Sequence, residues 1–163
     1  MAATDSDSSL FVVFDLVRAF RSRFEEAVSA SPVAVTPAES RVLLDLTKHG
    51  PSRQAEIGER LAIGAMSVTG LVDRLEKAGF VRREADPEDR RAKCIHLTTA
   101  SAPVLEEIQR VKSALRDRAT RNIDPADYEI YTRVIRQMRA NLADSRCSEN
   151  APQSIGKSET RNA

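Results

Sequence analysis

Hydrophobic residues between positions 51 and 98 recur at spacings that are typical of helices and then of strands. From residue 51 to residue 61 a narrow apolar face is formed by Ala55, Ile57 and Leu61. From residue 65 to residue 78 four apolar residues recur at spacings of three, four and seven: Val68, Leu71, Val72 and Leu75. Such spacing predicts an amphipathic helix with one buried stripe. The stretch therefore begins with two predicted short helices.

Glycine, proline and serine indicate where these helices begin and end. Gly50 and Pro51 are expected to end the preceding segment, because glycine adopts the left-handed conformation and proline cannot continue a helix. Ser52 is then expected to cap the first helix with its hydroxyl. Gly64 lies in the turn and is an acceptable N-cap for the second helix, which Gly79 is expected to end.

Two helices joined by a short glycine-containing turn are typical of a helix-turn-helix, whose second helix lies in the major groove of DNA. The polar face of the second helix presents four candidate DNA contacts: Ser67, Thr69, Gly70 and Arg74. The small residues allow a close approach to the bases, and hydroxyl and guanidinium groups bind base edges or phosphates. Arg53, on the polar face of the first helix, is a further candidate. An amphipathic helix pair in a helical bundle explains the apolar stripe equally well.

The pattern after Gly79 changes to that of a strand pair. Phe80 and Val81 open the first strand, residues 85–89 are rich in turn-forming residues, and residues 91–98 form the return strand. The return strand alternates, with two side chains predicted inward and two outward: Ile95 and Leu97, then Cys94 and His96. A hairpin directly after a helix-turn-helix is a wing, and it favours the DNA-binding interpretation over the bundle.

Charged residues gather at the tip of this hairpin. Three of them are candidate DNA contacts: Arg90, Arg91 and Lys93. Asp89 lies two residues before Arg91 and can pair with it, which would orient the guanidinium. Arginine in a narrow minor groove is favoured electrostatically. Because the charges at the tip are nearly balanced, a solvated turn is the alternative interpretation.

The rest of the chain is predicted to be helical. Apolar spacing predicts helices over residues 10–30, 36–47, 100–121 and 126–143, the second opened by a Thr-Pro-Ala-Glu capping box. Four of the five phenylalanines lie in the first helix: Phe11, Phe14, Phe20 and Phe24. Aromatic residues at helical spacing usually mean packing, so core packing or a dimer interface is favoured over a ligand-binding box. His49 is expected to cap its helix rather than bind a metal.

Composition and charge exclude several classes of protein. The formal net charge is +1, and residues 51–98 hold nine Lys or Arg against eight Asp or Glu, again a difference of +1. DNA binding would therefore depend on individually placed arginines rather than on bulk charge. No apolar run is long enough to span a membrane and the acidic N-terminus is unlike a secretory signal, so a cytoplasmic protein is expected.

The two cysteines and two histidines suggest no cofactor, metal or catalytic site. Cys94 and Cys147 are too isolated for a disulfide framework or a zinc site. Lys93 could lower the pKa of the Cys94 thiol, and oxidation of Cys94 could then disturb the wing, although this is the less favoured interpretation. The chain holds no recognisable catalytic triad, phosphate-binding loop or nucleophile elbow, so an enzyme is not expected.

The helix-turn-helix and its wing closely resemble the MarR family of bacterial transcription regulators. The similarity is carried by Ser67-Val68-Thr69, by Leu71 to Lys77, by Gly79-Phe80-Val81 and by the run from Asp86 to Thr98. Residues 89–98 fit the family wing pattern D-x-R-x-x-x-I/V-x-L-T, and residues 89–93 resemble the SlyA-type branch. With the flanking helices the resemblance covers roughly residues 10 to 143.

The resemblance implies a homodimeric winged-helix repressor that binds pseudo-palindromic operators and is released by a small anionic aromatic effector. By motif position, Arg91 would enter the minor groove with Asp89 as its partner, and Ser67 and Thr69 would face the major groove. The chain departs from many relatives in having Gly64, Ala65 and Gly70 where they have acidic, Arg or Asn residues. A larger share of specificity is therefore expected from the wing and from DNA shape.

These observations predict a mainly α fold with a small β-hairpin wing, that is, a winged helix-turn-helix with a helical dimerisation region. The expected parts are a disordered N-terminus, a dimerisation helix with its linker, the DNA-binding unit, further dimerisation helices and a disordered tail: residues 1–9, 10–35, 36–98, 99–143 and 144–163. The expected function is ligand-responsive repression through double-stranded DNA. A winged helix that binds only another protein is the alternative, and it would not require Arg90, Arg91 or Lys93. The residues that bind an effector are not indicated.

Overall fold

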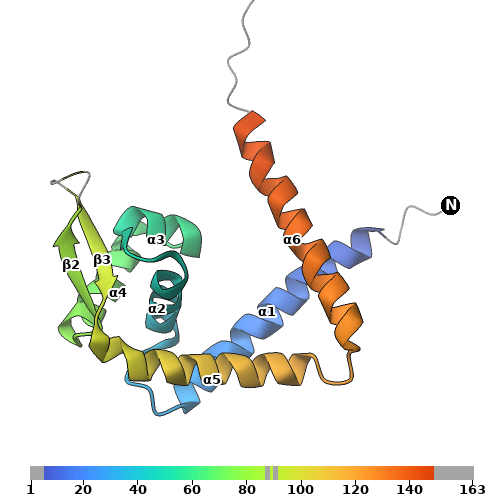
Figure 1. Ribbon diagram of the computed structural model, residues 1–163, viewed down its shortest axis with the longest axis horizontal. Coiled ribbons are helices and arrows are strands. Elements are labelled where there is room, and N and C mark those ends of the chain that lie inside the picture. The colour runs from blue at the N-terminus through green and yellow to red at the C-terminus, as the bar shows by residue number, and fades with distance from the viewer. Residues whose placement is uncertain (1–5, 87–88, 90–91, 149–163) are drawn as a thin grey trace, which may run out of the picture. The chain divides into compact units, whose positions relative to one another are not determined.

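The computed structural model describes residues 6–86, 89 and 92–148, and the side chains of residues 10–86, 89 and 92–142. It is mainly helical with a small antiparallel sheet, which confirms the predicted fold class (Figure 1). The elements are α1 (Ser6–Ala30), α2 (Pro37–His49), β1 (Ser52–Arg53), α3 (Gln54–Leu61), α4 (Ala65–Lys77), β2 (Val81–Ala85), β3 (Lys93–Leu97), a 3-10 turn (Thr99–Ser101), α5 (Ala102–Ala119) and α6 (Pro125–Ser148). The chain divides after Ala119 into two compact units.

One hydrophobic core holds the helix-turn-helix together. Its fully buried members come from α2, α3, α4, the sheet and α5: Val42, Leu43, Leu46, Ile57, Val68, Leu71, Val72, Leu75, Val81, Ile95 and Ile108. The predicted apolar stripe of α4 is buried as a whole, because its period of three and four matches the helical turn. The exposed face of α4 is thereby fixed on the side away from the core.

Local end signals place α2 and α4. Thr36 and Glu39 form the predicted capping box at the start of α2: the Thr36 N–H donates to Glu39 Oε2 at 2.8 Å, and the Glu39 N–H donates to the Thr36 hydroxyl at 3.3 Å. Gly64 is the N-cap of α4, as expected. Gly79 follows α4 with φ +78°, a left-handed conformation that a side chain would oppose.

The turn between α3 and α4 is tight. Gly58 in α3 lies so close to the next helix that a Cβ atom there would meet the Ile63 carbonyl oxygen at 3.1 Å and a Val68 methyl group at 3.2 Å. Ala62 takes the left-handed conformation at the C-cap of α3, with φ 53°. The turn therefore begins at Ala62, two residues before Gly64.

The sheet contains a third strand that the hydrophobic pattern does not reveal. Strand β3 is central and pairs antiparallel with both β2 and β1, with Ser52 opposite Ile95. Ser52 is therefore a buried strand residue, and the prediction that it caps α3 is wrong. Its hydroxyl donates to the Gly50 carbonyl at 3.0 Å, and Arg53 is the N-cap of α3.

An ion pair between the partly exposed Arg60 and the buried Asp45 joins α3 to α2. The Arg60 guanidinium makes two hydrogen bonds to Asp45 Oδ2, at 2.6 and 3.1 Å, and one to Oδ1 at 3.0 Å. Its Nη2 also donates to the Ser52 hydroxyl at 2.8 Å. Arg41 of α2 in turn donates to the Leu61 carbonyl at 3.0 Å, at the C-terminal end of α3. These bonds hold the first helix of the motif beside α2.

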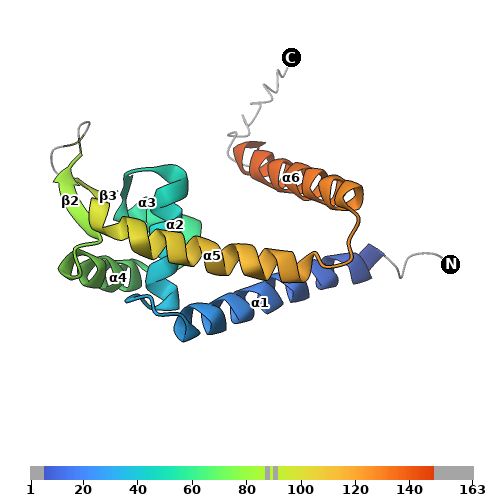
Figure 2. The same cartoon turned by 60° about the horizontal axis from the view of Figure 1, so that its bottom comes forward.

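Helix α1 packs along α5, as Figure 2 shows. It begins at Ser6, four residues before the predicted start at Leu10, so residues 6–9 of the segment predicted to be disordered are helical. Helix α6 likewise continues to Ser148, five residues past the predicted end at Ala143. The predictions for residues 1–5 and 149–163 lie outside the described residues. Among the described helices, none combines the length and the apolar character that crossing a membrane requires.

Candidate nucleic-acid interface

Helix α4 presents the predicted contact residues on its exposed face. Ser67 and Thr69 are exposed, and Gly70 is half-buried. The Thr69 hydroxyl donates to the Ala65 carbonyl at 3.0 Å, so its hydrogen is used within the helix while its oxygen can still accept a bond. The structure therefore leaves this face open to a ligand, although it offers few donors.

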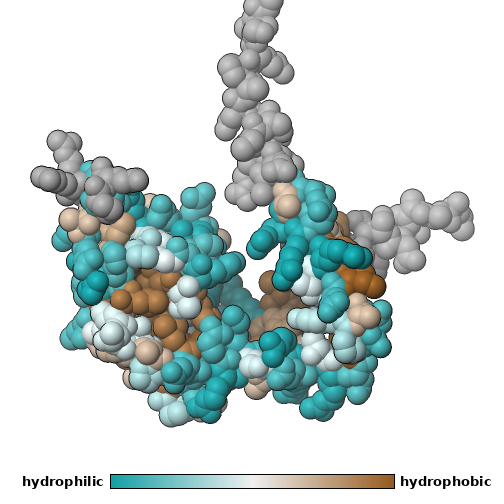
Figure 3. Space-filling model, in the orientation of Figure 1, coloured by the Kyte–Doolittle hydropathy of each residue, from teal (hydrophilic) through white to brown (hydrophobic). Residues whose placement is uncertain are grey.

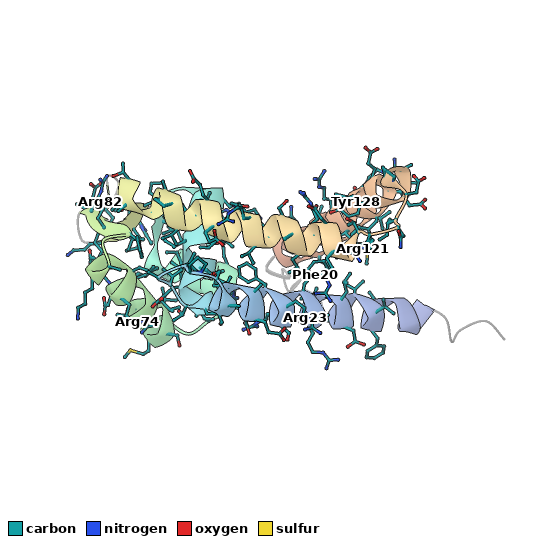
Figure 4. The ribbon with its side chains drawn as sticks, turned by 90° about the horizontal axis from the view of Figure 1, so that it is seen from below. Phe20, Arg23, Arg74, Arg82, Arg121 and Tyr128 are labelled. Atoms are coloured by element: carbon teal, nitrogen blue, oxygen red, sulfur yellow. The ribbon has the colours of Figure 1, made fainter. Side chains whose placement is uncertain are left out.

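Arg74 is held by a carboxylate of α2. Its Nε–H donates to Glu39 Oε1 at 2.6 Å, while the arginine side chain stays 59% exposed. Burial alone would raise the pKa of Glu39, but hydrogen bonds from the Thr36 N–H and from Arg74 outweigh it and lower the pKa. Figure 4 shows Arg74 on α4 and Arg82 on the adjacent strand β2. The predicted DNA contact of Arg74 stays a prediction, and the structure adds that Glu39 fixes one edge of the guanidinium.

Arg83 fastens the wing to α4, and sequence reasoning missed it. Its Nη2 lies 2.5 Å from Asp73 Oδ1, its Nη1 bonds to Glu76, and its backbone N–H donates to Glu76 Oε1 at 3.1 Å. Burial lowers the pKa of the Arg83 guanidinium, but the bonds to Asp73 and Glu76 outweigh that effect and raise it. Two carboxylates three residues apart on a helix, followed by a strand arginine, are the signal that could have revealed this clamp.

Asp86 organises the base of the wing. This buried carboxylate accepts a bond from Arg53 Nε at 2.6 Å and one from the Cys94 thiol at 3.2 Å, both on Oδ2. Its Oδ1 accepts the Asp89 N–H at 3.2 Å. The bond to Asp86 raises the pKa of the Arg53 guanidinium. Arg53, predicted as a DNA contact, is thus bound to the wing base, with its side chain 40% exposed.

Cys94 lies inside the protein, which corrects the prediction of an outward thiol. It is buried in β3 and bonded to Asp86, and Ile95 on the other face of the strand is buried as well. Burial, followed by the hydrogen bond to Asp86, raises the pKa of the Cys94 thiol. The suggestion that Lys93 lowers this pKa is therefore wrong. A thiol that stays protonated is a poor nucleophile and a poor redox sensor.

The wing tip is described only in part. Lys93 is exposed at the start of β3, and Asp89 is exposed, with its carbonyl oxygen accepting the Ala92 N–H at 2.8 Å. Arg90 and Arg91 lie outside the described residues, so their roles and the pairing of Asp89 with Arg91 stay predictions. Within the described part of the chain there is no cluster of side chains suited to a metal ion.

Cys94 provides a chemical test of the wing base. In a variant with Cys147→Ser, so that Cys94 is the only thiol, we expect alkylation by iodoacetamide at pH 8 to be at least about tenfold slower than in the urea-unfolded chain. The free energy of unfolding should also fall as the pH rises above about 9.0, the ordinary thiol value, because the unfolded chain loses that proton first. Cys94→Ala should remove this alkaline decline. Fast alkylation of the folded chain would contradict the buried position.

An exposed, core-anchored second helix and a wing fastened to it define a winged helix-turn-helix, a class of double-stranded DNA-binding protein. The MarR family model matches residues 35–93. The chain is 34% identical to the HTH-type transcriptional regulator YkoM of Bacillus subtilis over 122 residues, 74% of this chain and 78% of that protein. The chain belongs to the MarR family. It is a DNA-binding transcriptional regulator, which confirms the prediction of a regulator rather than an enzyme.

Two further similarities are more limited, one in the length that it covers and the other in sequence identity. The HTH-type transcriptional repressor MdtR of Bacillus subtilis is 36% identical over 84 residues, 52% of this chain and 54% of MdtR. The solved structure of Bordetella bronchiseptica BpsR, whose DNA binding is regulated by 6-hydroxynicotinic acid, has a TM-score of 0.63 and 20% identity, with 79% of this chain and 91% of that chain covered. The BpsR structure supports the fold. The SlyA-type branch stays a prediction.

Proposed function

We propose that the protein is a ligand-responsive repressor that binds pseudo-palindromic operators as a homodimer. The exposed face of α4, with the wing fastened beside it by Arg83, carries this proposal. A repressor needs a surface that fits one DNA site well enough to exclude other proteins from it. The similarity to MdtR, a repressor, supports this direction of control.

Two apolar surfaces support the homodimer. In α1 the exposed large apolar residues are Leu10, Phe11, Val12, Phe14, Leu16 and Val17. In α6 they are Ile130, Tyr131, Val134, Met138 and Leu142. Figure 3 shows hydrophobic side chains, in brown, at the surface on the right of the view. Exposed aromatic and aliphatic side chains in such numbers mark an interaction site, and a second copy covers them with matching surfaces.

The residues of the DNA interface would contact different parts of the duplex. Ser67, Thr69 and Gly70 would face the major groove, and Arg90, Arg91 and Lys93 would reach the minor groove and its phosphates. Asp89 would orient Arg91. Arg53 and Arg74, each bound to a buried carboxylate, would present the rest of their guanidinium groups to phosphates in fixed positions.

A hollow between α1 and α5 is the effector site that the geometry favours. Its volume is about 230 Å³, and its lining includes Phe20, Leu115, Arg23 and Arg118. Apolar walls with two guanidinium groups suit a small aromatic anion, the class to which the BpsR effector belongs. Binding there would alter DNA affinity only if the ligand prefers the arrangement of α1 and α5 that misplaces the two recognition helices.

Binding to DNA from the upstream region of its own gene tests the function. We expect the protein to bind this DNA selectively over random DNA, with an affinity that falls steeply between two salt concentrations, because phosphate contacts release counterions. Arg91→Ala should reduce the preference for the operator roughly tenfold. The wing is predicted to supply a large share of the sequence specificity. This prediction is contradicted if the operator preference survives Arg91→Ala but is abolished by Ser67→Ala and Thr69→Ala. A folded dimer that binds no DNA selectively would favour a protein-binding winged helix.

A further inference from the structure

The most exposed large hydrophobic side chain of the described residues is that of Met66, which is 86% accessible to solvent. It is the second residue of α4, on the helix that enters the major groove in winged helix-turn-helix proteins. The sequence pattern does not single out Met66, because it lies outside the regularly spaced apolar residues that predict the helix. The core does not need Met66, since the buried stripe of α4 lies on another face.

The neighbours of Met66 add few donors to this end of the helix. Ala65 precedes it, and Thr69, three residues on, has its hydroxyl hydrogen bonded to the Ala65 carbonyl. Two longer polar residues further along the helix are already paired: Asp73 binds Arg83, and Arg74 binds Glu39 through its Nε. The exposed surface at the start of α4 is therefore mainly methyl and thioether groups, with the Ser67 hydroxyl beside them.

Only one base presents a matching surface in the major groove. Thymine carries a 5-methyl group there, whereas cytosine presents an amino donor, adenine presents a donor and an acceptor, and guanine presents two acceptors. An apolar side chain pressed against a donor or acceptor removes its water and supplies no partner, which is unfavourable. A methionine is long, unbranched and polarizable, so it follows the outline of a methyl group without strain.

We propose that Met66 reads thymine by contact with its 5-methyl group in each operator half-site. This inference rests on the operator binding proposed above and names a specificity-determining residue for it. Direct readout by α4 would then depend on an apolar contact where the longer donors are engaged within the protein. Cytosine would be rejected at that position, and 5-methylcytosine, which carries the same methyl group, would be partly accepted.

The test removes one methyl group at a time from the DNA. Operators are first selected by the full-length protein from a pool of random duplexes. Each thymine is then replaced by uracil, which lacks only the 5-methyl group. We expect one thymine per half-site to matter, with a loss of about fourfold in affinity for each methyl group removed. Replacing it by 5-methylcytosine should cost less than replacing it by cytosine.

Variants assign the effect to Met66. In Met66→Ala, and in Met66→Gln, which keeps nearly the same shape but is polar, the thymine-to-uracil difference at that position should disappear. Thermal unfolding should be unchanged, because the side chain is exposed in the free protein. Lys77→Ala, at the other end of α4, is the matched control: it can weaken binding to all DNA but should keep the difference.

The outcomes separate this inference from the proposed function. Selective operators with no thymine-to-uracil effect, or an effect that persists in Met66→Gln, would overturn the role of Met66 and leave the regulator intact. If the selection yields no preferred sequence from a folded protein, operator binding itself is overturned and the role of Met66 with it.

Discussion

Phe14→Glu is expected to convert the proposed homodimer into monomers. The Phe14 side chain is 71% exposed in α1, next to the exposed side chains of Phe11 and Val17, so a carboxylate there is tolerated in the free chain but not between two copies. DNA affinity should fall at least about a hundredfold, because the two half-sites are then no longer bound together. Analytical ultracentrifugation and operator titration measure the two effects.

The same charge elsewhere on α1 controls for general electrostatics. Ser29 is exposed near the C-terminal end of the helix, fifteen residues from Phe14, and Ser29→Glu should leave both the dimer and the operator affinity nearly unchanged. Phe14→Leu, which keeps an apolar side chain, should retain the dimer. A dimer of normal strength in Phe14→Glu would show that the apolar surface of α1 is not the interface.

Elements with local signals could be predicted from the sequence. The capping box at Thr36 and Glu39 and the glycine after α4 act within one helical turn, so their residues alone determine where the helices begin and end. The buried stripe of α4 follows from its period in the same way. These signals place the exposed face of the recognition helix, and with it Ser67 and Thr69, before any tertiary contact is known.

Features that depend on distant partners could not be predicted. Strand β1 is two residues long and exists because it pairs with β3, some forty residues later, so Ser52 carried only the misleading signal of a helix cap. Cys94 lies on the face of β3 opposite to Ile95, as the alternating pattern predicts, but Asp86 and Arg53 cover that face. Its thiol is consequently inside, and the neighbouring Lys93 does not control its pKa.

The arginines show the same limit at the candidate interface. The sequence locates Arg74 and Arg53 on polar faces, yet a polar face does not distinguish a side chain directed at DNA from one bound to a carboxylate. In the structure both are bound at Nε, to Glu39 and to Asp86. The two proposed phosphate contacts are therefore positioned by buried acids, which the net charge of +1 does not reveal.

Arg83→Met is expected to weaken operator binding by more than its cost in stability would suggest. Methionine fills much of the same space, and Asp73 and Glu76, whose side chains are 57% and 38% exposed, regain water. The free energy of unfolding should therefore fall by only about 1–2 kcal/mol. The wing would lose its ionic contacts with α4, and the freed Asp73 carboxylate would repel the DNA phosphates, so affinity should fall about thirtyfold or more.

The adjacent arginine is the matched control. Arg82 lies on the same strand, its side chain is 56% exposed, and it pairs with Glu84 at 2.8 Å. Arg82→Met therefore removes the same charge but keeps the contacts between Arg83 and α4. It should lower affinity only as the loss of one charge does. Adding Asp73→Asn to Arg83→Met should recover part of the lost affinity, because the repelling carboxylate is gone. Operator affinity is measured at two salt concentrations, and unfolding curves are recorded for each variant. If Arg82→Met and Arg83→Met lose the same amount of affinity, the contacts of Arg83 do not position the wing.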